Sequence, residues 1–138
     1  MKFQSRHILA VLFTGLWINT SEFFRNELLL KSAWVEHYQS IGMVFPSAPL
    51  NAAVWVGWGF LLSIAIYVIS RKFSIVQTAL IVWFMGFVLM WIAVWNLNVL
   101  SWAILRYAIP LSLVEVFVGS YICAVFAKPR PQPRVQST

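Results

Sequence analysis

Two long stretches of this chain carry no charged side chain. Residues Tyr38–Ser70 contain none, residues Phe73–Leu105 contain none, and only the basic pair Arg71–Lys72 separates them. Hydrophobic residues make up 61% of the 138 positions, and a soluble domain of this size leaves too much surface in water to hide so many. The solvent for most of this surface must be lipid, so the sequence predicts an integral membrane protein.

Four segments have the composition of transmembrane helices, which need about 20 mostly apolar residues. We predict spans at about residues 7–24, 50–70, 74–95 and 99–126, the last interrupted by Pro110. Together they make one membrane domain over residues 1–128. The expected fold class is therefore all-α, a four-helix transmembrane bundle in contact with the lipid bilayer.

The basic residues outside the spans predict which side of the membrane each loop faces. Arg71 and Lys72 lie between the second and third spans, and further Lys and Arg residues precede the first span and follow the fourth. Because cytoplasmic loops carry an excess of such residues, both termini are predicted to be cytoplasmic, in a plasma or inner membrane. The first span has an alternative interpretation as a cleaved signal peptide, although no small-x-small cleavage site follows Ile18.

The longest predicted segment between two spans is an outer loop at about residues 25–49. Ser21 is predicted to cap a helix that ends near Gly42, with an apolar stripe that includes Leu30, Trp34 and Tyr38. Such an amphipathic helix would lie in the outer interface or cap the bundle. The tail at residues 129–138 contains three prolines and no apolar core, and is predicted to be a disordered cytoplasmic segment.

Glu115 is the sharpest candidate for a functional residue, because it lies near the middle of the fourth span. An ionised carboxylate at that depth costs several kcal/mol unless it is paired or hydrated. Ser112 shares its face, and the small residues Ala108, Gly119 and Cys123 continue that face at helical spacing. Glu115 is expected to point into the bundle or a subunit interface. It is either a proton-binding or cation-binding group, or a neutral residue that hydrogen-bonds across helices.

Arg106 is the other charged residue of the fourth span. It precedes Glu115 by nine residues, which at about 100° per residue puts the two on opposite faces of a straight helix. Pro110 removes the hydrogen bond to the carbonyl of Arg106 and can kink the helix there. We interpret Arg106 either as an arginine that reaches the outer lipid headgroups, or as a partner for an anion, for Glu115 or for a glutamate of the outer loop.

The second span carries two pairs of small residues at four-residue spacing, Ala53 with Gly57 and Gly59 with Ser63. Small residues at this spacing let helices approach closely in lipid. We interpret both pairs as helix-packing seams rather than as a binding site. The small faces of the second and fourth spans predict assembly into a homo-oligomer or a larger membrane complex.

Several classes of function are disfavoured by what the sequence lacks. The basic residues flank apolar spans and leave no footprint for nucleic acid. The residues Cys123, His7 and His37 are too few for a metal site of nitrogen and sulfur ligands within one chain, and the spans offer no pair of axial histidines for heme. With no known catalytic motif in the sequence, we expect a non-enzymatic protein without catalytic residues, metal or cofactor.

Gly15-Leu16-Trp17 lies in the first span, with Trp34 downstream and Gly86-Phe87 in the third span. These short motifs resemble those of a family of small four-span bacterial membrane proteins. In that family a Gly-Leu-Trp-like step ends the first span and a polar, aromatic segment follows. The resemblance implies the four-span fold and no particular activity.

Two functional classes follow from these features. The first is a structural or accessory membrane subunit that assembles through its small-residue helix faces. The alternative is an oligomeric proton-coupled transporter or channel that uses Glu115. Size and an intramembrane glutamate are similar to those of the small multidrug-resistance exporters. Their essential carboxylate lies in the first span, however, and the first span here has none before Glu22.

Overall fold

The computed structural model describes residues 3–127, and every regular element in that range is a helix. In chain order these elements are α1 (Phe3–Phe23), the π-helical η1 (Phe24–Leu29), α2 (Lys31–Ser40), α3 (Pro49–Ser70), α4 (Ile75–Trp83), the π-helical η2 (Phe84–Val88), α5 (Leu89–Asn96) and α6 (Trp102–Ala127). The predicted all-α class is confirmed. The predicted disordered tail at residues 129–138 lies outside the described residues.

Three helical segments are long and apolar enough to cross a membrane, namely Pro49–Ser70, Ile75–Asn96 and Trp102–Ala127. They coincide with the predicted second, third and fourth spans to within three residues at each end. α1 is slightly shorter, at 21 residues, and polar and charged side chains flank its apolar core at Ile8–Ile18. The three apolar helices indicate a membrane protein.

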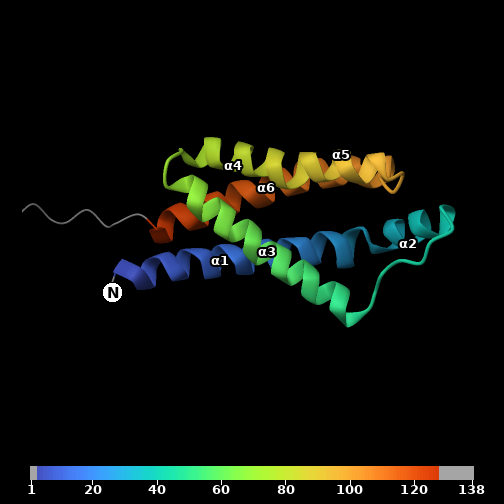
Figure 1. Ribbon diagram of the computed structural model, residues 1–138, viewed down its shortest axis with the longest axis horizontal. Coiled ribbons are helices and arrows are strands. Elements are labelled where there is room, and N and C mark those ends of the chain that lie inside the picture. Colours follow the sequence, from blue (N-terminus) through green and yellow to red (C-terminus); the bar gives the residue numbers. More distant parts are fainter. Residues whose placement is uncertain (1–2, 128–138) are drawn as a thin grey trace, which may run out of the picture.

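The helices form a bundle in which α1 and α6 pack against each other and against α3, while α4 packs against α6 (Figure 1). Their buried side chains make one core, formed by Ala10, Ile18, Leu62, Ile66, Ala79, Val82, Phe87, Val116 and Cys123. Gly119 lies where three helices meet, since a Cβ there would be 3.3 Å from Cδ1 of Ile18 and of Ile66. The small face of α6 therefore sets the close spacing of the bundle.

The two halves of α3 have different surroundings. Its buried residues are Gly59, Leu62, Ser63 and Ile66. Residues 52–57, in contrast, are all exposed. Six consecutive residues cover about 1.7 turns of an α-helix, so no face of this segment is buried against the described chain. Figure 1 shows this end of α3 pointing away from α4 and α5.

α2 ends in a Schellman motif at Gly42, whose φ of 73° is in the left-handed region. The N–H of Met43 donates to the carbonyl of Tyr38 at 2.8 Å, which satisfies a carbonyl of the last helical turn. The helix predicted to end near Gly42 therefore does so. Its predicted start is wrong, because α1 continues through Ser21 to Phe23. The Ser21 hydroxyl has a different partner, described below.

The closest approach of α1 and α3 leads to a prediction about stability. A Cβ on Gly15 would lie 2.4 Å from Cδ1 of Phe60. Overpacking of this kind costs about 1–3 kcal/mol, and we expect Gly15→Ala to lower the unfolding free energy in mixed micelles by that amount. Thr20→Ala is the control, because Thr20 is exposed on the same helix, and such surface substitutions usually change stability by less than about 0.5 kcal/mol. Equal losses for the two variants would contradict this packing of α1 on α3.

Candidate functional site

Glu115 lies inside the bundle on α6, and its side chain is fully buried at 0% exposure. Its Oε2 atom accepts hydrogen bonds from Oγ of Ser21 at 3.0 Å and from Nη1 of Arg25 at 2.9 Å. The indole N–H of Trp17 donates to the backbone carbonyl of Glu115 at 2.9 Å. Side chains of α1 and η1, from the opposite end of the sequence, therefore hold both the carboxylate and the backbone of this residue.

Arg25 is the cation of the site and is only 5% exposed. Its Nη1 atom pairs with Glu115, and its Nη2 atom forms a salt bridge with Glu22 on α1. The guanidinium carbon also lies over the ring of Phe87, 5.3 Å from the centroid. The planar fork of guanidinium donors can serve two carboxylates while its face lies on an aromatic ring. One arginine thus joins α1 and η1 to α6 and to η2.

The polar contacts continue from Glu22 toward α2. Nδ2 of Asn26 donates to Oε2 of Glu22 at 2.7 Å, and the indole N–H of Trp34 donates to Oδ1 of Asn26 at 3.1 Å. A ring nitrogen of His37 donates to the carbonyl of Val99 at 2.8 Å. Hydrogen bonds therefore connect α2 both to the buried ion pairs and to the turn that precedes α6.

The two π-helical segments of the described chain meet at this site. Arg25 belongs to η1 and Phe87 belongs to η2. A π-helical turn changes the register of the side chains that follow it, and such turns occur frequently at functional sites. Their meeting at a single cation–π contact marks this part of the bundle as the candidate site.

The Glu22–Arg25–Glu115 cluster contains two carboxyl groups and one guanidinium. An arginine side chain stays protonated in proteins, so the cluster has a net charge of about −1 when both carboxyls are ionised. Oε1 of Glu115 is buried and has no hydrogen-bond partner among the described residues. A buried acceptor without a donor is costly, which distinguishes this oxygen from Oε2 of the same side chain.

Arg25 has different surroundings from those that the sequence pattern predicts, whereas Arg106 lies on the outside of α6. Arg25 is predicted in the outer loop, but it is buried and pairs with Glu115. Arg106 is exposed, and its guanidinium lies over the ring of Tyr107, 4.8 Å from the centroid, on the outside of the bundle. Arg106 is exposed and Glu115 is buried, so the two side chains lie on different faces of α6. A signal for Arg25 was present in its three-residue spacing from Glu22, which puts the two side chains on one helix face.

The other candidate residues fall into two groups. The buried group consists of Ser112, Gly119, Cys123, Gly59 and Ser63, with Ala108 half-buried. The indole N–H of Trp83 donates to Oγ of Ser112 at 3.0 Å, which links α4 to the small face of α6. Ala53 and Gly57 are exposed and contribute to no packing seam within the described chain. In the part of the chain that the structure describes, no group of three His, Cys, Asp or Glu residues could hold a metal ion.

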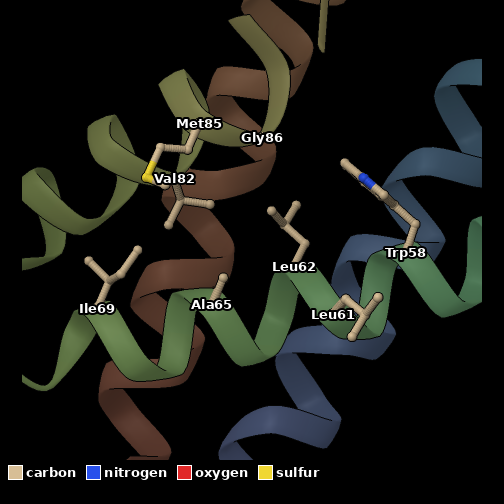
Figure 2. Close-up of a pocket in the computed structure, with 8 residues that line it drawn as sticks. All are labelled: Trp58, Leu61, Leu62, Ala65, Ile69, Val82, Met85 and Gly86. Atoms are coloured by element: carbon tan, nitrogen blue, oxygen red, sulfur yellow. The ribbon is translucent and has the colours of Figure 1, made fainter. Parts of the chain in front are cut away.

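A second feature is an open apolar groove of about 230 Å³ between α3 and the α4–η2 segment. Its walls include Leu62, Ala65 and Ile69 on one side and Val82, Met85 and Gly86 on the other. Figure 2 shows Leu62 and Ala65 pointing toward Val82 across it. These lining residues offer a ligand no charged group, so the groove suits an apolar chain or helix rather than a polar solute.

No protein-family model matches this chain, and no curated protein or solved structure matches it significantly.

Proposed function

We propose that this protein is a small, non-enzymatic subunit of a membrane assembly, that it crosses the bilayer four times, and that it assembles through α3. The observation that carries the proposal is the segment of α3 at residues 52–57, which is exposed on every side although it is part of an apolar, membrane-spanning helix. A segment that packs so little on its own chain has most to gain from packing on another.

The fourth span in this proposal is α1. Its 21 residues measure about 31 Å at 1.5 Å per residue, which matches a hydrocarbon core of about 30 Å. It also packs along α6 as a membrane neighbour would. Its two ends carry most of its polar residues, as expected for a helix whose ends reach the interfaces.

The positions of the aromatic and basic residues support an orientation with both termini cytoplasmic. Trp55, Trp95 and Trp102 are exposed and lie near the start of α3, the end of α5 and the start of α6, which is one end of the bundle. Tryptophan at this level is typical of a membrane interface. Arg71 and Lys72, between α3 and α4, lie at the opposite end, where the positive-inside rule predicts the cytoplasm.

The partner that best fits the exposed segment is α3 of a second copy. Ala53 and Gly57 lie one turn apart on it, and small residues at this spacing let two identical helices approach closely. Their neighbours are apolar, with Val54 64% exposed and Val56 49% exposed. In lipid, helix association depends on such van der Waals contact rather than on the hydrophobic effect. The apolar groove along the second half of α3 extends the surface available to the partner.

Disulfide crosslinking in native membranes tests this proposal. In a Cys123→Ser background, which removes the single native cysteine, we expect Gly57→Cys to give a covalent dimer upon mild oxidation. Trp55→Cys is the matched control, because it has the same depth but lies about 200° around the helix. A dimer through position 55 instead of 57, or a monomeric mass in mild detergent together with no crosslink at 57, would overturn assembly through this face.

A further inference from the structure

We propose that the Glu22–Arg25–Glu115 cluster binds one exchangeable proton, on the carboxylate oxygen of Glu115 that no donor reaches. The inference concerns a ligand-binding site for a proton and goes beyond the assembly role. It does not depend on that role, because the cluster lies inside one chain and the proposed assembly face lies on α3.

The first argument is the balance of charge in a buried place. Glu22, Arg25 and Glu115 are 8%, 5% and 0% exposed, respectively. With both carboxyls ionised, the single guanidinium leaves one negative charge uncompensated, and an isolated charge in such surroundings is strongly unfavourable. One bound proton makes the cluster neutral. No rearrangement of the ion pairs is needed.

The second argument is the geometry of the two Glu115 oxygens. Ser21 and Arg25 both donate to Oε2, whereas buried Oε1 accepts no hydrogen bond from a described residue. Protonation forms an O–H bond at Oε1 and turns an acceptor without a donor into a donor. The carboxyl loses its negative charge, Arg25 keeps its pairing with Glu22, and Ser21 keeps its acceptor. Solvent supplies the proton as hydronium.

The third argument is that the surrounding elements offer no other charge to balance the cluster. α3 and the α4–η2–α5 stretch contain no Asp, Glu, Lys, Arg or His residue. On α1, Arg6 and His7 lie at the other end of the helix, more than about 20 Å from Glu22 along its axis.

The charged residues on the outer side also have other surroundings. Glu27 and Lys31 pair with each other, Glu36 is exposed, and His37 bonds to a backbone carbonyl. Arg106 of α6 is exposed.

The contacts of the cluster indicate the side from which a proton enters. Glu22 is the member with the largest exposed fraction, and its carboxylate is bound by the half-buried Asn26. Asn26 in turn contacts Trp34 on α2. These polar groups lead from Glu115 toward α2, so exchange with water is expected from the side of the membrane where α2 lies. Such a site would serve the alternative transporter function, although binding requires no transport.

Infrared spectroscopy of the full chain in lipid bilayers tests the proposal. A protonated buried carboxyl has a C=O stretch that is separate from the carboxylate bands and shifts in D₂O. We expect this band in the wild type at neutral pH, equivalent to one carboxyl per chain, and its complete loss in Glu115→Gln. Glu27→Gln makes the same chemical change in the exposed Glu27–Lys31 pair and is expected to leave the band unchanged.

Each other outcome overturns a stated part of the proposal. Absence of the band from the wild type between about pH 5 and pH 9 would show that both carboxyls stay ionised and that the cluster binds no proton. A band that persists in Glu115→Gln but disappears in Glu22→Gln would place the proton on the wrong carboxyl. The wild-type measurement needs no variant to fold, and the crosslinking of α3 tests the assembly role separately.

Discussion

Arg25→Ala is expected to lower the free energy of unfolding by about 3–5 kcal/mol, because it removes the cation from a buried cluster and leaves two carboxyl groups behind. Glu22 and Glu115 would then lie in the same buried space without the guanidinium that now binds both. The loss of the guanidinium face from the Phe87 ring adds to the effect. We therefore expect this to be among the most damaging single substitutions in the chain.

Reversible denaturation in mixed micelles measures this effect, and Lys31→Ala provides the control. Lys31 pairs with Glu27 at 2.5 Å, but their side chains are 50% and 37% exposed, so removal of this cation is expected to change stability by less than about 1 kcal/mol. Combining Arg25→Ala with Glu22→Gln removes the carboxylate that Arg25→Ala leaves without its cation, and is expected to recover part of the loss. If Arg25→Ala lowered the free energy of unfolding by no more than Lys31→Ala does, the buried cluster would not need its cation, and this prediction would be wrong.

Phe87→Ala is expected to destabilise the bundle by about 3–5 kcal/mol, because it removes a large ring from the packed interior. Phe87 is 1% exposed and belongs to the buried core. Its ring centroid lies 5.5 Å from that of Trp58 and 6.0 Å from that of Trp91. The guanidinium of Arg25 lies over the face of the ring. Truncation would leave a cavity between α3 and η2 and uncover the buried guanidinium.

The same π-helical segment contains a matched control for this prediction. Phe84 lies three residues before Phe87 but is 52% exposed on the outside of the bundle. Phe84→Ala should change the unfolding free energy by less than about 1 kcal/mol in the same micelles, since lipid or detergent replaces the ring. If the two variants were equally stable, the ring of Phe87 would not be part of a packed core.

The membrane class and the apolar helices could be predicted from the sequence because both depend on local composition. An uncharged run that is long enough to span a bilayer is recognised without knowing its neighbours, which is why the spans at about 50–70, 74–95 and 99–126 agree with the three apolar helices. The inward direction of Glu115 could also be predicted. Ser112, Gly119 and Cys123 repeat on its face of α6, and that regularity belongs to a single helix.

The partner of Glu115 could not be predicted in the same way. Arg25 is separated from it by 90 positions, and their contact depends on how α1 is rotated and how far it is shifted along α6. The π-helical turn at Phe24–Leu29 also changes the direction in which the following side chains point. No pattern in the sequence specifies these quantities, so Arg25 is easily assigned to the outer loop by its position beside other charged residues.

Composition and helical periodicity by themselves determined that this chain is an apolar helical protein with a small, polar face around Glu115. Both properties are local, because lipid selects for apolar runs and a helix repeats every 3.6 residues. Only the tertiary structure decided that Arg25, rather than Arg106, pairs with Glu115, and that Ala53 and Gly57 stay uncovered while Gly59 and Ser63 are buried. These outcomes depend on how whole helices cross, because a crossing covers one half of α3 and leaves the other half free.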